Sequence, residues 1–227
     1  MTRKLAIFDW NGTILSDTQA SLKASNECLA LYGKGPIDLA TFQRTFHFPI
    51  IHFYVENGCR VDDILKSSDL ANTTYQKAYG AYSKHCRSRH GARDLLKWLH
   101  KNDVTCMILS NYLTRMIEPV LERLRLTPYI HHISANECDG STILHKTSKL
   151  ERLSEFMTKR GYAPKNAFII GDSMEEPEIA HQLSLLSFSI TGGCVSEARL
   201  KKAGADHIVH QLSALKPILT EKWKLRP

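Results

Sequence analysis

Short runs of apolar residues recur along the chain, and each ends at a polar residue or a glycine. The first run, residues 5–8, stops at Asp9 and is followed by Asn11-Gly12, a pair that breaks a strand. Similar runs lie at 104–109, 129–134, 167–171, 186–190 and 207–209. Runs of this length without alternation are typical of strands buried on both faces, so they predict a parallel sheet.

Amphipathic segments lie between these runs and predict helices. Residues 92–100 place Leu95, Leu96 and Leu99 on one face. Residues 115–126 form a second helical pattern with Pro119 inside it, and a third at 148–160 begins at Ser148, a good N-cap, and stops at Gly161. Strands that alternate with helices predict an α/β fold with right-handed crossovers.

Residues 17–86 lack the strand pattern and carry apolar residues at helical spacing. We therefore predict a helical module at 17–86, inserted into an α/β core formed by 1–16 and 87–227. The aromatic-rich segment 42–54 is interpreted as the core of this module.

Composition adds exclusions. No apolar run in the 227 residues is long enough to span a bilayer, and the first strand begins too early to leave room for a signal peptide, so we expect a cytoplasmic protein without a membrane partner. The six cysteines are scattered, which favours free thiols over a zinc site.

The formal net charge of +7 is spread along the chain. The densest basic clusters, 84–90 and 222–226, are short, and we interpret them as solvated surface rather than a nucleic-acid site. A basic surface can also steer small phosphorylated anions.

Four polar residues stand at strand ends or a helix start: Asp9, Ser110, Lys149 and Asp172. In an open α/β sheet, ligands bind beyond the carboxyl ends of the strands. Each residue has an ordinary structural explanation when taken singly, because Asp9 can start a turn, Ser110 can cap a helix and Lys149 can be solvated.

Together, the order Asp, Ser, Lys and an acidic cluster resembles the four motifs of the haloacid dehalogenase-like superfamily. Asp9-Trp10-Asn11-Gly12-Thr13 is similar to its first motif, and 171–180 to its fourth. The segments 191–193 and 200–207 resemble the phosphoglycolate phosphatase-like branch. The resemblance implies a Rossmann-like parallel sheet core with an inserted all-helical cap domain.

The resemblance also implies a Mg²⁺-dependent phosphohydrolase for a small phosphorylated substrate, with Asp9 as the nucleophile that forms an aspartyl-phosphate. Mg²⁺ would be held by Asp9, the Asn11 backbone carbonyl and Asp172, with Glu176 near its water shell. Phosphate oxygens would be bound by Ser110, Asn111, Gly12 and Lys149. Lys146 competes with Lys149 for the role of site lysine.

Two positions depart from the family pattern. Asn11 stands where its phosphatases carry an Asp that acts as general acid and base, and an amide has no proton to give. This favours esters with good leaving groups, such as acyl or aryl phosphates. The alternative is a weakly active or inactive member that binds a phosphorylated ligand or a protein partner. The second departure is Glu176, where Asp is usual.

Other chemistry of the superfamily, such as phosphonate cleavage through a cap lysine, stays open, with Lys23, Lys34 and Lys66 as cap lysines. The cap should set substrate specificity because lids enclose the leaving group. Arg44, His47 and His52 are the candidates to face it. We expect a monomer or homodimer.

Overall fold

Six parallel strands form one sheet in the order β3-β2-β1-β4-β5-β6, so the first strand lies near its centre. The computed structural model describes residues 3–137 and 148–226. The strands are β1 (Lys4–Phe8), β2 (Val104–Leu113), β3 (His132–Asn136), β4 (Ala167–Gly171), β5 (Leu186–Ile190) and β6 (His207–Val209).

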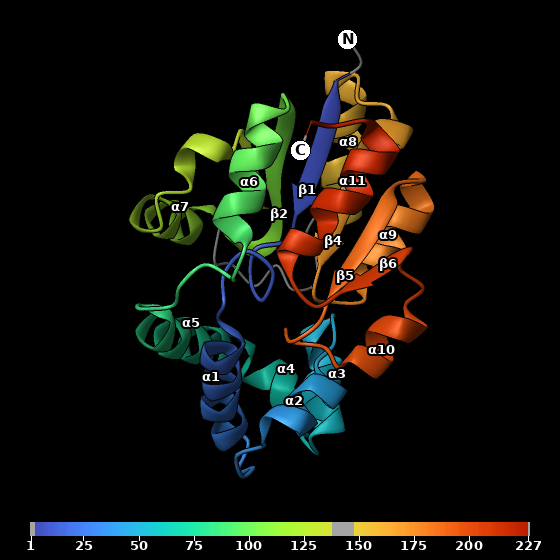
Figure 1. The fold of residues 1–227 in the computed structure, drawn as a ribbon. Coiled ribbons are helices and arrows are strands. Elements are labelled where there is room, and N and C mark those ends of the chain that lie inside the picture. The colour runs from blue at the N-terminus through green and yellow to red at the C-terminus, as the bar shows by residue number, and fades with distance from the viewer. Residues whose placement is uncertain (1–2, 138–147, 227) are drawn as a thin grey trace.

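Helices cover both faces of this sheet, which is why its strands are continuous apolar runs. Ala6 and Phe8 of β1 belong to the core on one face, and Leu5 and Ile7 to the core on the other. The first face packs against α6 (Ala92–Lys101), α7 (Thr114–Arg123) and α11 (Leu215–Trp223), and the second against α8 (Lys149–Arg160) and α9 (Glu175–Leu183) (Figure 1). The predicted α/β class is confirmed.

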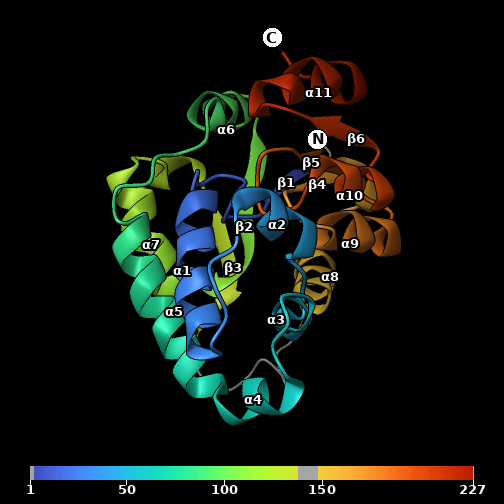
Figure 2. The ribbon, with the colours of Figure 1, turned by 90° about the horizontal axis from the view of Figure 1, so that it is seen from below.

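An all-helical layer lies beside the edge of the sheet where β1 ends (Figure 1). Its two longest helices, α1 and α5, pack side by side, and α2 and α3 lie across from them (Figure 2). The helices are α1 (Thr18–Leu31), α2 (Leu39–Thr45), α3 (Ile50–Glu56), α4 (Val61–Lys66) and α5 (Ser68–Ser83). The prediction of an inserted helical cap is confirmed, whereas its bounds at 17 and 86 stay a prediction.

The aromatic segment forms the interior of the cap, as expected. Phe42 and Phe53 are fully buried and meet edge to face, and Phe46 packs against both. This cluster continues into the core domain through Val195 and through Leu200 of α10 (Glu197–Lys202).

Hydrogen bonds join the same two parts. The Gln43 side chain donates from Nε2 to the Gly193 carbonyl at 2.7 Å, and Arg199 donates to the Phe46 carbonyl at 2.6 Å. Apolar and polar contacts therefore hold the α2 end of the cap on the core.

The helix predicted at 148–160 is confirmed together with both of its end signals. Ser148 forms a capping box with Glu151, and Gly161 closes α8 in the left-handed conformation at φ 70°. Because Lys149 is the first residue of α8, this cap fixes its position.

Two predicted strand bounds were wrong. The strand at 104–109 continues through Leu113, because after an irregularity in register Leu113 pairs with Asn136. Ser110 therefore lies inside β2 rather than after it. The strand predicted at 129–134 begins only at His132, since a 3-10 turn that contains Pro128 occupies Thr127–Tyr129 ahead of it.

Among the helices of residues 3–137 and 148–226, none has the length and apolar character needed to cross a membrane. The five cysteines of these ranges are free, and Cys106 is buried in β2. Cys138 lies outside the described residues.

Candidate active site

Asp9 and Asp172 directly follow β1 and β4, and Ser110 of the neighbouring β2 lies two residues beyond the level at which β1 ends, so all three come to one edge of the sheet. Phe8 at the end of β1 is in register with Ile108 of β2 and Ile170 of β4. The Asp9 backbone N–H continues this ladder by donating to the Ile170 carbonyl at 2.9 Å. Parallel strands end at a common edge, and ligand sites of α/β folds lie there.

Lys149 binds the Asp9 carboxylate directly. Its Nζ lies 2.8 Å from Asp9 Oδ1, 2.6 Å from Glu176 Oε1 and 3.3 Å from Glu175 Oε2. Burial disfavours the charged ammonium, but the three carboxylates together outweigh it and raise the pKa of Lys149. The competing candidate, Lys146, lies outside the described residues.

Glu176 holds Lys149 in place. One carboxylate oxygen accepts from Lys149, and the other accepts from the Ser173 hydroxyl at 2.7 Å. Burial acts against the ionised form, but these partners outweigh it and lower the pKa of Glu176. Since both oxygens are engaged, Glu176 positions the lysine here, and its place near a metal stays a prediction.

Asp172 lies in a cradle made by two glycines. A Cβ atom at Gly12 would lie 2.2 Å from Asp172 Oδ2, and one at Gly193 would lie 2.1 Å from the same oxygen. The Cys194 N–H donates to Oδ2 at 2.5 Å. Both positions therefore require glycine, because any side chain would displace the carboxylate.

The Thr13 side chain lies between the carboxylates of Asp9 and Asp172. Its hydroxyl lies 3.4 Å from Asp9 Oδ2 and 3.3 Å from Asp172 Oδ1, so both carboxylates contact the same hydroxyl. Burial, with added repulsion from Glu176 and Asp172, raises the pKa of Asp9 well above its ordinary value despite the neighbouring Lys149. Burial likewise raises the pKa of Asp172 to about 6.

The donor set fits one hard divalent cation. Residues 3–137 and 148–226 contain no group of three or more His, Cys, Asp or Glu side chains placed to hold a metal. Mg²⁺ does not need one, because it is usually bound by one or two carboxylates and completes its octahedron with water and substrate oxygens. Asp9 and Asp172, the predicted ligands, would supply the two carboxylates.

Asn11 is turned toward the cap. Its Nδ2 donates to Asp17 Oδ2 and to the Tyr79 hydroxyl, both at 2.7 Å, and Tyr79 in turn donates to Asp17. Both amide hydrogens are therefore engaged, and the free atom of this side chain is Oδ1, an acceptor. Burial raises the pKa of Asp17 against the effect of these hydrogen bonds.

The residues expected to bind phosphate also make hydrogen bonds within the protein. The Gly12 N–H donates to Asp17 Oδ1 at 2.6 Å, and Ser110 Oγ accepts from the Tyr112 N–H at 3.0 Å. Asn111 Nδ2 donates to Glu175 Oε2 at 3.0 Å. Their roles toward phosphate stay predictions, and Glu175 joins two of the predicted phosphate ligands, Lys149 and Asn111.

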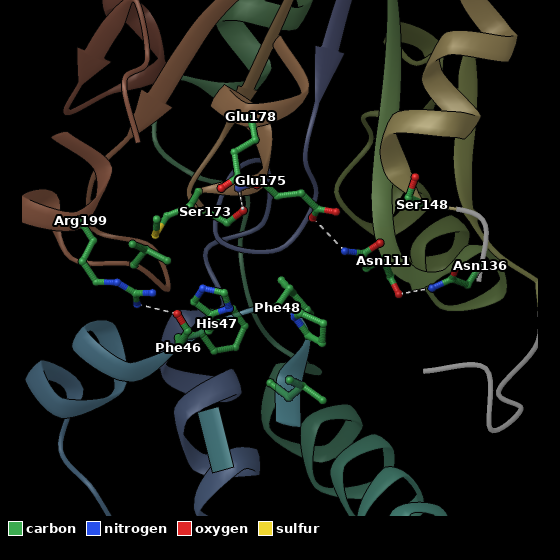
Figure 3. A pocket seen from close by; sticks show the side chains of 14 residues that line it. Phe46, His47, Phe48, Asn111, Asn136, Ser148, Ser173, Glu175, Glu178 and Arg199 are labelled. Carbon is green, nitrogen blue, oxygen red and sulfur yellow. Dashed lines mark hydrogen bonds between the residues drawn. The ribbon is translucent and has the colours of Figure 1, made fainter. Parts of the chain in front are cut away.

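A cavity of about 400 Å³ opens beside these groups, between the loop that joins α2 to α3 and the core (Figure 3). Glu175 belongs to its wall and also reaches Lys149, so the cavity adjoins the Asp9 site. Of the three cap residues expected to face the substrate, His47 lines this cavity. Arg44 and His52 are exposed and are not part of its wall, and their roles stay predictions.

Three residues that build the site have no role predicted from the sequence: Asp17, Tyr79 and Glu175. Glu175 stands within the segment 171–180 that resembles the fourth motif, but its partners Lys149 and Asn111 are distant in sequence, and Asp17 follows the first motif. Tyr79 lies 62 positions from Asp17 and comes from another helix, so no local pattern indicates the contact.

Residues 6–188 match the family model described as "Haloacid dehalogenase-like hydrolase". The chain belongs to this family.

Within the family, the chain is similar to phosphoglycolate phosphatases. It is 25% identical to one from Agrobacterium fabrum over 96% of this chain and 93% of that protein, and 24% identical to one from Pseudomonas fluorescens over 76% of this chain. The second match spans 64% of the relative's length. These relatives place the chain in the phosphoglycolate phosphatase-like branch and support a phosphatase.

A solved structure agrees on the fold. A HAD family hydrolase from Deinococcus radiodurans, crystallised with bound phosphate and sodium, superposes with a TM-score of 0.71 at 18% identity and covers 99% of this chain and 98% of that one.

Proposed function

We propose that this protein is a Mg²⁺-dependent phosphatase that hydrolyses a small phosphate monoester through an aspartyl-phosphate on Asp9. The observation that carries the proposal is the Asp9 carboxylate at the end of β1, bound by Lys149 at 2.8 Å and facing Asp172 across Thr13. The similarity to phosphoglycolate phosphatases supports the same chemistry.

The residues divide the work as follows. Asp9 attacks phosphorus, the bond from phosphorus to the leaving oxygen breaks, and the leaving group takes its proton from solvent. Water then hydrolyses the acyl phosphate and restores the carboxylate. Lys149 offsets the charge of the nucleophile and of the phosphoryl oxygens.

Asp9, Asp172 and the Asn11 carbonyl would hold Mg²⁺. When bound, the ion would neutralise phosphoryl charge and orient those oxygens for attack.

Asn11 favours one alternative function. Because its amide hydrogens are both bound to Asp17 and Tyr79, it supplies no proton to a leaving group. General acid catalysis is worth roughly 10²–10⁴-fold in rate. A member without it would bind a phosphorylated ligand or a protein partner with little turnover of alkyl esters.

The test is hydrolysis of p-nitrophenyl phosphate and acetyl phosphate, with Mg²⁺ and with EDTA, by wild type and by Asp9→Asn. We expect Mg²⁺-dependent turnover that falls by roughly 10³-fold or more in Asp9→Asn, since the nucleophile is lost. Asp62→Asn, an exposed carboxylate on α4, is the matched control and should retain wild-type activity.

Thermal unfolding of each variant checks that the chain is folded. Turnover that persists in Asp9→Asn would contradict the proposed nucleophile. Binding of orthovanadate with Mg²⁺ but no turnover of either ester would favour the alternative.

A further inference from the structure

The cavity beside the Asp9 site has a wall of defined chemistry. Its cap side is formed by the loop residues Phe46, His47, Phe48 and Pro49 and by Ile50 at the start of α3. The core side carries polar groups next to the predicted phosphate ligands. Figure 3 shows the cap side chains opposite Glu175 and Asn111, so the cavity lies where the non-phosphate half of a substrate would extend.

Most of the wall is apolar. Two phenyl rings from the cap, Phe46 and Phe48, stand 5.3 Å apart edge to face, and Met174 and Val195 complete the apolar surface from the core. Phe48 is 42% exposed although it is a large apolar side chain. An apolar ligand that covers this ring would gain the free energy of its burial.

The charges on the wall are mainly negative. Glu175 and Glu178 both line the cavity, and Glu178 is exposed to it. The one arginine of the described wall, Arg199, directs its guanidinium to the Phe46 carbonyl at 2.6 Å (Figure 3). A carboxylate in this cavity would therefore meet phenyl rings and the exposed carboxylate of Glu178, while Glu175 is paired with Lys149 and Arg199 is held on the Phe46 carbonyl.

One polar group of the wall is unpartnered. His47 Nδ1 is buried and has no hydrogen-bond partner among the described residues. Its imidazole points from the cap toward Ser173 and Glu175 (Figure 3). It can therefore exchange one hydrogen bond with a neutral polar substituent of a ligand.

We propose that the substrates are phosphate monoesters of uncharged phenols, with the aromatic ring against Phe46 and Phe48 and one polar substituent at His47. The proposal rests on the proposed phosphatase function and specifies its substrate class. It separates this chain from its named relatives, since phosphoglycolate presents a carboxylate where this wall carries two glutamates. A phenol also leaves without prior protonation, which suits a site whose Asn11 has no proton to give.

The test measures affinity apart from leaving-group reactivity. Two non-hydrolysable phosphonates represent the two esters: benzylphosphonate for an aryl phosphate and 3-phosphonopropionate for phosphoglycolate. Their affinities for the Mg²⁺-loaded protein are measured by calorimetry and as inhibition of p-nitrophenyl phosphate hydrolysis. We expect benzylphosphonate to bind roughly tenfold or more tightly, from ring burial and the absence of like-charge repulsion.

Variants of the cavity wall test whether its residues cause this difference in affinity. Phe48→Ala should lower the affinity for benzylphosphonate roughly tenfold, because the ligand's ring loses this contact. The affinity for 3-phosphonopropionate, which has no ring, should stay within about twofold of wild type. Glu178→Gln should raise the affinity for 3-phosphonopropionate and leave that for benzylphosphonate unchanged. Leu70→Ala, an exposed apolar side chain of α5 that is not part of the wall, is the matched control and should change neither affinity.

The outcomes separate the two proposals. Equal or tighter binding of 3-phosphonopropionate overturns the substrate class, even where p-nitrophenyl phosphate is hydrolysed through Asp9. Absence of Asp9-dependent turnover overturns the phosphatase, and the calorimetric ranking then still supports or contradicts the ligand class. A Phe48→Ala variant that loses both phosphonates equally also overturns the proposed ring contact.

Discussion

Gly12 shows how a single backbone position sets the place of the Asp172 carboxylate. It has φ 69°, a left-handed conformation, and its Cα approaches Asp172 so closely that a Cβ would clash. Gly161 has nearly the same φ, 70°, but open space around it. A substitution at Gly161 therefore tests backbone strain alone, whereas one at Gly12 tests the same strain together with displacement of Asp172.

We predict that Gly161→Ala lowers the free energy of unfolding by roughly 1–2 kcal/mol, the cost of a left-handed Ala, with activity retained. Gly12→Ala should cost more and abolish Mg²⁺-dependent activity, because the new methyl displaces Asp172. Chemical denaturation and phosphatase assays of both variants check this. Equal stability losses with equal activity would show that Asp172 does not depend on Gly12.

Asn11 and Asp17 form a second residue-scale test. Asn11→Asp places a carboxylate where Nδ2 now donates to Asp17 at 2.7 Å, so two acids would share one site. We predict a loss of roughly 1–3 kcal/mol in unfolding free energy at neutral pH. The loss should shrink in acid, since one carboxyl of the pair then keeps a proton.

The compensating variant Asn11→Asp with Asp17→Asn should recover stability, because an amide again faces a carboxylate. It should also hydrolyse alkyl phosphates faster than wild type, since residue 11 gains a proton donor. Unfolding curves and steady-state rates measure both effects. A fully stable, fully active single variant would contradict the pairing of Asn11 with Asp17.

At the scale of elements, α5 is linked to the first motif by one side chain. Tyr79 of α5 is 2% exposed, and its hydroxyl bonds both Asp17 and Asn11. Its stacking on Tyr75 and edge contact with Tyr112 orient the ring. The position of the cap is thereby linked to the loop that carries Asn11.

Tyr79→Phe should lower the free energy of unfolding by roughly 1–3 kcal/mol, because the buried Asp17 carboxylate loses a donor. Turnover should fall as the Asn11 side chain loses its restraint. Tyr82→Phe on the same helix removes an exposed hydroxyl bonded to Glu27 and should stay within about 0.5 kcal/mol of wild type. Similar effects of the two variants would argue against the link.

At the scale of the molecule, the stability of the protein should depend on pH, because protons and Mg²⁺ compete for the buried carboxylates of Asp9 and Asp172. Burial raises the pKa of Asp172 to about 6, and that of Asp9 also lies above its ordinary value. The folded chain then keeps a proton that the unfolded chain has lost. Metal-free stability should therefore fall as pH rises from about 4 through 6, by on the order of 3 kcal/mol for Asp172.

Mg²⁺ requires the ionised carboxylates, so its stabilising effect should grow over the same range. We predict a larger Mg²⁺-induced rise in Tm at about pH 7.5 than at about pH 5, measured by thermal unfolding with and without EDTA. Asp172→Asn should remove most of this difference, and Asp62→Asn should preserve it. A Mg²⁺ effect independent of pH would contradict the site.

The strand ends were predictable because each depends on local pattern. The apolar run before Asp9 and the one before Asp172 identify buried parallel strands, and the common edge of a parallel sheet then brings these acids together. The start of α8 was equally local, since Ser148 and Glu151 cap it. The end of β2 and the start of β3 were not, because they depend on pairing between the strands.

The sequence by itself determined the α/β class, the helical cap and the order of the four motifs, since hydrophobic periodicity and end signals act within a few residues. Only the tertiary structure decided that Lys149 contacts Asp9, that Asn11 turns to Asp17 and Tyr79, and that Phe48 and Glu178 share one cavity wall. These contacts join residues far apart in the chain, and their geometry follows from how the cap packs on the sheet edge.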